Sequence, residues 1–359
     1  MTTPDPQRTA VVAGVSGIVG RAIAGRLVAG GWRVVGLSRH APDPGIPGLV
    51  HRPVDLGDRD ACRDALAAVA GDASHAVYAG RAPDPDPAVE AARNTAMLVN
   101  LVEGLEAAGA PLAHVLLVHG TKWYGSQFGA YKTPAEEDDP RAPGANFYFD
   151  QQDWVSGRAA EAGWTWTALR PHILSGFSLG YPHNAVGVLA AYGALAKARG
   201  RPLTFPGTPE AFDSVSQITD VRLLVDAMLW AMTTPAAGGE AFNVINADYF
   251  RWRDLWPRLA AFFGTEPGGV ATETLADTHA GMDALWSGLV DEHGLSEPDL
   301  GRIVSWSYGD FMLRIGWDDM SSTLKIRRAG FEGVRGSWES LADALAEYRV
   351  RRVIPRPGP

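Results

Sequence analysis

Three glycines near the start of the chain have the spacing of a phosphate-binding turn. Gly14, Gly17 and Gly20 follow an apolar segment at residues 10–13, and a helical pattern begins near Ile18. A turn of this kind places unpaired backbone N–H groups at a helix N-terminus, where they and the helix dipole attract a pyrophosphate. The first glycine permits the tight turn, the second lets the backbone approach the ligand, and the third lets the helix pack on the strand. The spacing G-x-x-G-x-x-G predicts a dinucleotide site, and a plain structural turn is the alternative.

The residues after the second predicted strand, residues 32–37, favour a phosphorylated ribose. An NAD-preferring site usually has an Asp or Glu here, which binds the ribose 2′-OH. This chain has Ser38, Arg39 and His40 instead, and its next acid is Asp43. A hydroxyl, a guanidinium and an imidazole suit a 2′-phosphate, which Arg39 can contact with two N–H groups at once. We therefore predict NADPH as the cofactor. The alternative is an ordinary surface-loop arginine.

One of the four lysines lies at a position where a catalytic residue is expected. Lys122 closely follows the apolar residues 115–118, so it lies at the carboxyl end of a predicted buried strand, above the expected cofactor. An ammonium there is either functional or a surface group whose stem packs on apolar residues, and its position favours function. Short-chain dehydrogenases usually place a Lys four residues after a Tyr on one helix face, where the ammonium lowers the phenol pKa. This chain contains no Tyr-x-x-x-Lys.

Composition narrows the classes of function. A net charge of −9 argues against a nucleic-acid surface. No stretch approaches the ~20 apolar residues that a membrane helix needs. The single cysteine, Cys62, excludes an intrachain disulfide and a cysteine-based zinc site. The nine histidines show no H-x-x-x-H or H-E-x-x-H pairing, so we expect no metal site. We expect a cytoplasmic enzyme.

Strand and helix patterns alternate through the first half, as is typical of a doubly wound parallel sheet, the Rossmann fold. The predicted strands are residues 10–13, 32–37, 49–54, 75–78, 115–118 and 165–169, and the helices begin near residue 18 or span residues 59–69, 88–108 and 147–162. We expect the last of these strands to complete the sheet. Residues 119–146 have little periodicity, and a loop of that length is usually functional or disordered.

In the second half of the sequence, strand and helix patterns no longer alternate regularly. Helical patterns cover residues 184–198, 221–232, 252–263 and 338–349, with a strand at residues 241–245. These predict a smaller, mostly helical lobe that caps the carboxyl edge of the sheet, where ligands of open α/β folds bind. We predict an NADP(H)-binding domain at residues 1–170 and a substrate-binding lobe at residues 171–359, with some interleaving. The tryptophans of this half, Trp252, Trp256, Trp286, Trp306 and Trp317, are expected to build its core.

Several unusual motifs occur in an order that resembles one known family. They are HGTKWYG, EEDDPRAPGANFYFDQQDW, ALRPHILSGFS, RPLTFPGTPEAFD, EAFNVINADYFRWRDLW and a C-terminal Gly330-Phe331. Together they look like the progesterone 5β-reductase/iridoid synthase-like enzymes, which are atypical extended short-chain dehydrogenase/reductases. The resemblance covers nearly the whole chain.

The resemblance implies where the catalytic residues lie. The family's lysine belongs to a G-x-K-x-Y segment, matched by Lys122, and its tyrosine follows an Asn-Phe pair, matched by Tyr148. The sequence departs from the family pattern at Trp123, where a His is common, at Phe149, which replaces a second Tyr, and at His119, which replaces a Thr. These changes leave the Lys/Tyr pair in place and could alter substrate choice.

The implied reaction is an NADPH-dependent 1,4-reduction of an α,β-unsaturated ketone or aldehyde. The Tyr148 hydroxyl would donate to the enolate oxygen, and Lys122 would hold that phenol or the ribose hydroxyls. For Tyr148 the alternative is a core aromatic at the start of a helix. A carbonyl reductase or a nucleotide-sugar epimerase/dehydratase of the same superfamily is a second possibility, although both normally rely on Tyr-x-x-x-Lys. A non-catalytic NADP(H)-sensing regulator is a third.

The remaining site residues follow from the motif and the resemblance. The predicted cofactor contacts are Gly14, Ser16, Gly17, Ile18, Val19 and Gly20 in the turn, Ser38, Arg39 and His40, Asp55 and Leu56 at the adenine, Ala79 and Gly80 beneath the cofactor, His119, Lys122 and Tyr148, and Pro171 and Leu174 against the nicotinamide. Predicted substrate contacts are Phe128 at the pocket mouth, Trp123 and Trp338, with ordinary packing as the alternative for Phe128 and Trp338. The expected partner is a small enone, and the expected state is a monomer or homodimer.

Overall fold

A seven-stranded parallel sheet is the centre of one half of the computed structural model, which describes residues 8–356. The strands are β1 (Thr9–Ala13), β2 (Arg33–Ser38), β3 (Leu49–Pro53), β4 (Ala73–Tyr78), β5 (His114–Val118), β6 (Thr165–Pro171) and β11 (Glu240–Val244). Their order is β11-β6-β5-β4-β1-β2-β3. Inner strands such as β1 and β5 are buried along almost their whole length and have no polar face, which explains why they read as apolar runs. The predicted doubly wound Rossmann sheet is confirmed.

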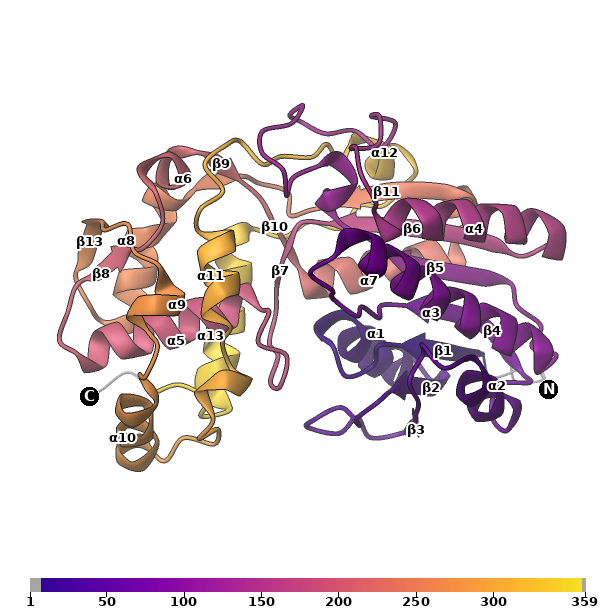
Figure 1. Cartoon of the computed structure of the whole chain (residues 1–359), viewed down its shortest axis with the longest axis horizontal. Coiled ribbons are helices and arrows are strands. Elements are labelled where there is room, and N and C mark those ends of the chain that lie inside the picture. The colour runs from indigo at the N-terminus through magenta and orange to yellow at the C-terminus, as the bar shows by residue number, and fades with distance from the viewer. Residues whose placement is uncertain (1–7, 357–359) are drawn as a thin grey trace, which may run out of the picture.

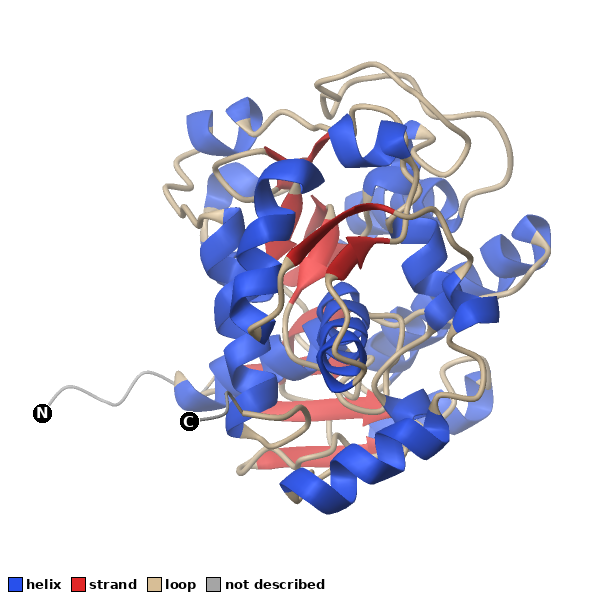
Figure 2. Ribbon diagram, turned by 90° about the vertical axis from the view of Figure 1, so that its left-hand side faces the viewer, coloured by secondary structure: helices blue, strands red, loops and turns tan. Residues whose placement is uncertain are grey.

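Helices cover both faces of this sheet (Figures 1 and 2). One face carries α2 (Arg59–Ala67), α3 (Pro87–Ala107) and α4 (Phe147–Ala162), and the other carries α1 (Ile18–Ala29) and α7 (Val221–Thr233). Alternate residues of each strand serve the two layers: in β1, Val11 and Ala13 join the cluster under α2 to α4, and Ala10 and Val12 join the cluster under α1 and α7. No helix among residues 8–356 is long and apolar enough to cross a membrane.

The expectation that the strand at residues 165–169 completes the sheet is wrong. A seventh strand, β11, pairs with β6 in parallel, from Glu240 opposite Thr167 to Val244 opposite Pro171. It satisfies backbone groups that β6 would otherwise expose at an open edge. The chain reaches this edge through α7, which packs against α1 on the sheet's face. Parts of the second half of the sequence therefore belong to the α/β half of the molecule.

The other half of the molecule is the helical lobe, on the left of Figure 1. Its helices are α5 (Ala185–Ala198), α6 (Pro209–Asp213), α8 (Trp252–Phe263), α9 (Leu275–Thr278), α10 (Asp283–His293), α11 (Trp306–Met312) and α13 (Ser337–Val350). Short strands pair within it or at its junction with the sheet: β7 (Ile173–Ser175) with β10 (Ile218–Asp220), β8 (Leu203–Phe205) with β13 (Pro267–Val270), and β9 (Val215–Ser216) with β12 (Phe250–Arg251). Near the far edge of the sheet, α12 (Leu324–Arg328) packs against β11.

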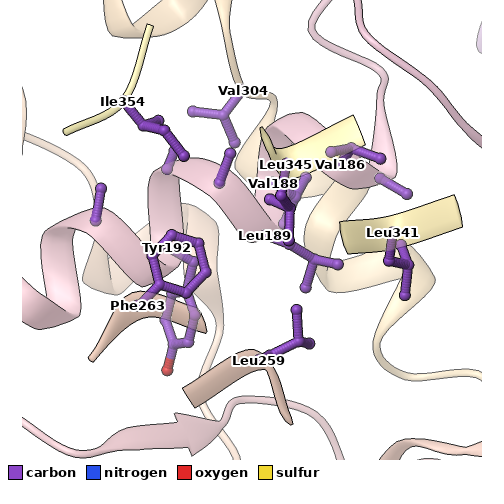
Figure 3. Close-up of a cluster of buried hydrophobic side chains, with 14 of the residues drawn as sticks. Val186, Val188, Leu189, Tyr192, Leu259, Phe263, Val304, Leu341, Leu345 and Ile354 are labelled. Atoms are coloured by element: carbon purple, nitrogen blue, oxygen red, sulfur yellow. The ribbon is translucent and has the colours of Figure 1, made fainter. Parts of the chain in front are cut away.

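The core of the helical lobe surrounds α5, every residue of which from Ala185 to Leu195 is buried. Side chains from α8, α13 and the C-terminal segment meet it, as Figure 3 shows for Leu259, Leu345 and Ile354. Trp252, Trp256 and Trp286 are buried in this core, and Trp306 packs against it, as the sequence predicts. Trp317 is not part of this cluster.

The long loop after β5 is packed rather than loose. It begins with a 3-10 turn, η1 (Thr121–Tyr124), and its later part is held at two places. Ala135 forms a β-bridge with Ser321, and the buried Glu137 accepts a hydrogen bond from the Asn243 backbone N–H of β11 at 2.7 Å. Sequence periodicity does not reveal these contacts, because they join distant segments.

Candidate active site

The glycine turn leaves room for a ligand at only one of its three glycines. Gly14, at the end of β1, has a φ of +78°, and a Cβ there would lie 2.6 Å from the Ala79 carbonyl oxygen. A Cβ on Gly20 would lie 2.2 Å from the Gly14 carbonyl oxygen, so α1 packs on the turn without a side chain between them. At Gly17, the N-cap of α1, the nearest neighbour of a Cβ is that same oxygen at 3.4 Å. The open N-terminus of α1 at Gly17 therefore fits a dinucleotide diphosphate.

Two adjoining cavities extend from this turn along the carboxyl edge of the sheet. The larger is about 540 Å³ and the smaller about 480 Å³. Both are lined by Gly14, Ser16, Arg39, Gly80 and Arg81, so they form one continuous cleft. Its length and position at the strand ends fit the binding crevice of an open α/β sheet.

Most of the predicted cofactor residues line this cleft. The larger cavity is lined by Gly14, Ser16, Gly17, Ile18, Val19, Arg39, Ala79, Gly80, His119, Lys122, Tyr148, Pro171 and Leu174. The smaller cavity adds Ser38, His40, Asp55 and Leu56. Gly20 does not line either cavity, because it faces the turn itself. Residues from seven separate segments of the sequence thus meet at one edge of the sheet.

Asn146 connects the segments that carry Lys122 and Tyr148. It caps the N-terminus of α4: its side-chain Oδ1 accepts a hydrogen bond from the Tyr148 backbone N–H at 3.0 Å. Its Nδ2 donates to the Lys122 carbonyl oxygen at 2.9 Å. One side chain therefore fixes η1 relative to the first turn of α4 and brings Lys122 and Tyr148 into the same cavity.

The phenol of Tyr148 lies at the carboxyl ends of β5 and β6. A Cβ on Gly120 would be 3.2 Å from its hydroxyl oxygen, so the absence of a side chain at Gly120 makes room for the phenol. The ring stacks on His119, with centroids 4.7 Å apart. Burial raises the pKa of Tyr148 to about 12, although the positive charge of Arg81 lowers it. The hydroxyl is therefore protonated at neutral pH and makes no hydrogen bond with any other residue in the range 8–356.

The ammonium of Lys122 also has no hydrogen bond or ion pair within the described part of the chain. Burial lowers the pKa of Lys122, Arg81 lowers it further, and Glu90 opposes both. The cation that lowers the pKa of Tyr148 is Arg81 and not Lys122. No hydrogen bond joins the Lys122 ammonium to the phenol in the described part of the chain, so of the two roles expected for Lys122, contact with the phenol or with ribose hydroxyls, the second is open to it.

None of the three predicted substrate residues lines the cleft among the described residues. Trp123 is buried between the Phe149 ring, at 4.9 Å, and the Arg170 guanidinium, at 3.6 Å. Phe128 is 65% exposed on the surface of the long loop. Trp338 packs in the helical lobe with the Arg258 guanidinium 4.8 Å from its ring. Trp338 thus has the ordinary packing that was its alternative, Phe128 lies on the surface, and Trp123 is enclosed by neighbouring side chains.

The side of the cleft opposite the sheet is formed by four residues that sequence reasoning missed. Tyr181, His183, Tyr308 and Phe311 line the larger cavity and form a chain of neighbouring rings with centroid separations of 5.8 to 6.3 Å. They come from the segment after β7 and from α11, and neither segment has a motif that singles them out. An aromatic wall of this kind suits a flat, largely apolar substrate.

The charge of the larger cavity is opposite to that of the whole chain. Arg39, Arg81 and Lys122 line it, and no carboxylate does among residues 8–356, although the chain carries a net charge of −9. Such a local excess of positive charge favours an anionic ligand. Arg81 directly follows the predicted cofactor residues Ala79 and Gly80, and this position was the only sequence signal that could have found it.

The sequence of this chain matches one family model and several named proteins. A family model described as a PRISE-like Rossmann-fold domain matches residues 59–312. A 3-oxo-Delta(4,5)-steroid 5-beta-reductase from Arabidopsis thaliana is 30% identical over 370 residues, which cover 97% of this chain and 94% of that protein. An (S)-8-oxocitronellyl enol synthase from Camptotheca acuminata is also 30% identical, over 98% of this chain and 94% of its own length.

Solved structures share the fold at lower sequence identity. A UDP-glucose 4-epimerase from Thermotoga maritima, solved with UDP-glucose, has a TM-score of 0.70 and 15% identity, and the match covers 95% of this chain and 99% of that one. A protein described as a putative epimerase from Burkholderia cenocepacia has a TM-score of 0.67 and 22% identity, over 97% and 100%. At these identities the likeness shows an extended Rossmann fold alone.

Proposed function

This chain belongs to the family of PRISE-like Rossmann-fold proteins, and from that premise we propose that it catalyses the NADPH-dependent 1,4-reduction of α,β-unsaturated ketones or aldehydes. As a member of that family it is an oxidoreductase with a nicotinamide cofactor. The observation that carries the proposal is that Lys122 and Tyr148, from separate segments, line one cavity beside the glycine turn. Both present donor groups that are not engaged by other residues of the described chain.

The residues of the cleft fit NADPH. The open N-terminus of α1 at Gly17 would hold the diphosphate, and Asp55 and Leu56 would lie at the adenine. Arg39 is exposed and has no ion-pair partner among the described residues, so its guanidinium is available to a 2′-phosphate. The cofactor would supply a hydride to the β-carbon of the enone.

The protein's own part in the reaction is to stabilise the negative charge that then forms on the carbonyl oxygen. The Tyr148 hydroxyl would donate a hydrogen bond to that oxygen, and burial keeps the pKa of this phenol high enough for it to stay protonated at neutral pH. Lys122 would bind ribose hydroxyls and add positive potential. The resulting enolate takes a proton at the α-carbon from water, so one hydride and one proton are added across the C=C bond.

The experiment follows NADPH absorbance with the purified protein, 2-cyclohexen-1-one and cyclohexanone, each repeated with NADH. We expect consumption of NADPH with the enone only. Reduction of the saturated ketone would indicate a carbonyl reductase instead, and tight NADPH binding without turnover of an enone panel would favour a regulator.

A Tyr148→Phe variant tests the role of the phenol. We expect it to bind NADPH normally and to lose enone turnover by roughly 10²-fold or more, because one donor to the oxyanion is removed. Tyr249→Phe is the matched control, since that phenol is 66% exposed and lies away from the cleft. Full turnover by Tyr148→Phe would contradict the mechanism.

A further inference from the structure

Arg81 is the cation whose charge affects the pKa of the Tyr148 phenol. It lines both cavities of the cleft, in the segment between β4 and α3, and its side chain is 39% exposed. Its positive charge lowers the pKa of Tyr148 against the larger effect of burial. In turn, burial lowers the pKa of Arg81, but Tyr148 and Glu90 more than offset this and raise it. Both side chains line the larger cavity.

The side chain of Arg81 and the backbone of the next residue, Ala82, are both held in position. Glu90, in the first turn of α3, accepts from its Nε at 3.0 Å and from its Nη2 at 2.7 Å, on a single carboxylate oxygen. The fully buried Asn94 clamps the next residue: its Oδ1 accepts from the Ala82 N–H and its Nδ2 donates to the Ala82 carbonyl, both at 2.8 Å.

One donor of the guanidinium is left over. The Nη1 group of Arg81 makes no hydrogen bond with another residue of the described chain, while Glu90 occupies the other two nitrogens and does not itself line the cleft. Guanidinium groups pre-organised in this way lose little freedom when they bind an anion. Arg81 thus presents a fixed positive charge to the cavity that Tyr148 also lines.

We propose that Arg81, positioned by Glu90, supplies the positive charge that stabilises the oxygen anion formed beside the Tyr148 hydroxyl. The inference rests on the proposed function and adds a third group to the Lys/Tyr pair. Fixed charges aimed at a developing oxyanion are worth most in a partly dehydrated site. The larger cavity has several other titratable or charged groups in its lining. They are Arg39 after β2, Lys122 in η1, His119 after β5, Tyr148 in α4, His172 after β6, and Tyr181, His183 and Tyr308 from the helical lobe, and Glu90 holds Arg81 from outside the lining.

The test uses a stable oxyanion as well as turnover. The anion of 4-nitrophenol absorbs visible light and, like an enolate, carries its charge on an oxygen conjugated to a planar system. In the presence of NADP⁺ we expect the bound phenol to ionise at a pH about one unit higher in Arg81→Gln than in the unchanged protein. Enone turnover by Arg81→Gln should fall roughly tenfold or more, less than for a direct donor, and Arg81→Lys should recover part of both effects.

The matched control is Arg158→Gln. Arg158 pairs with Glu106 at the other end of α3, at 2.9 Å and with a similar 38% exposure, but lies outside the cleft. We expect this variant to behave like the unchanged protein in both assays. If Arg81→Gln matches Arg158→Gln, or if it weakens NADPH binding as much as it slows turnover, the proposal is overturned. If no enone is turned over at all, the proposed function fails, and nitrophenol ionisation still decides the role of Arg81.

Discussion

The two glycines Gly17 and Gly20 should separate ligand binding from stability. Replacing Gly20 by Ala puts a methyl group 2.2 Å from the Gly14 carbonyl oxygen, which is backbone and cannot rotate away. Overpacking of this kind costs up to about 3 kcal/mol, and the gain in helix propensity returns about 1 kcal/mol. We therefore expect Gly20→Ala to lose about 2 kcal/mol of folding free energy.

Gly17→Ala should do the opposite. Its backbone angles, φ −79° and ψ 171°, suit any residue, and the nearest atom to the new methyl is 3.4 Å away. Stability should change by no more than about 0.5 kcal/mol. The methyl, however, would occupy the space through which a diphosphate reaches the helix N-terminus. Loss of one charge-assisted hydrogen bond there, about 1.5–3 kcal/mol, weakens NADPH roughly 10- to 150-fold.

Thermal denaturation and NADPH titration by fluorescence measure the two effects separately. We expect a lower midpoint and partly retained binding in Gly20→Ala, and an unchanged midpoint with weak binding in Gly17→Ala. The reasoning about this turn is refuted if Gly17→Ala binds NADPH as the unchanged protein does, or if Gly20→Ala is as stable as Gly17→Ala.

Three further predictions concern the cofactor, the active-site geometry and pH. Arg39→Ala should weaken NADPH at least tenfold and NADH little, because NADH lacks the 2′-phosphate; equal losses in cofactor titrations would contradict this. Asn146→Ala should lower kcat with little effect on NADPH affinity, because it removes both hydrogen bonds that join the Lys122 and Tyr148 segments. Asn146→Asp keeps the cap of α4 and should restore part of the activity. An unchanged kcat in Asn146→Ala would rule out this positioning role. Burial, with a smaller contribution from His75, lowers the pKa of His114 to about 4. The unfolded chain therefore binds the proton first as pH falls below 6.5, and about 2 kcal/mol of stability should be lost by pH 5. Thermal midpoints at the two pH values test this, and a midpoint that does not fall from pH 7 to pH 5 would contradict it.

Much of the α/β half could be predicted from the sequence because its signals are local. Parallel strands buried on both faces read as apolar runs, and capping residues such as Asp86 and Asn146 mark where helices begin. The glycine turn and the residues at the ends of β2, β3, β4 and β5 then fall along one edge by the logic of the fold.

What could not be predicted depends on contacts between distant segments. The place of β11 is decided by the path of α7 across the sheet and not by anything in residues 240–244. Arg81 lies at the start of a proline-rich loop, and its fixed position depends on the hydrogen bonds to Glu90, which the sequence does not reveal. Trp338 was expected at the pocket, but in the first turn of α13 its ring lies beneath the guanidinium of Arg258 from α8. Tyr181 and Tyr308 form one wall only after the helical lobe has folded.

The return of the chain to the sheet limits how this protein can be recombined with its relatives. A chimaera made by one crossover after β6 would take its edge strand β11, and the helix α7 that covers one face, from the other parent. Both pack on residues of the first half, so mismatched side chains would meet inside the core. An exchange of substrate lobes must therefore move at least two cassettes, one before β10 and one after β11, and leave residues 218–244 with the sheet they complete.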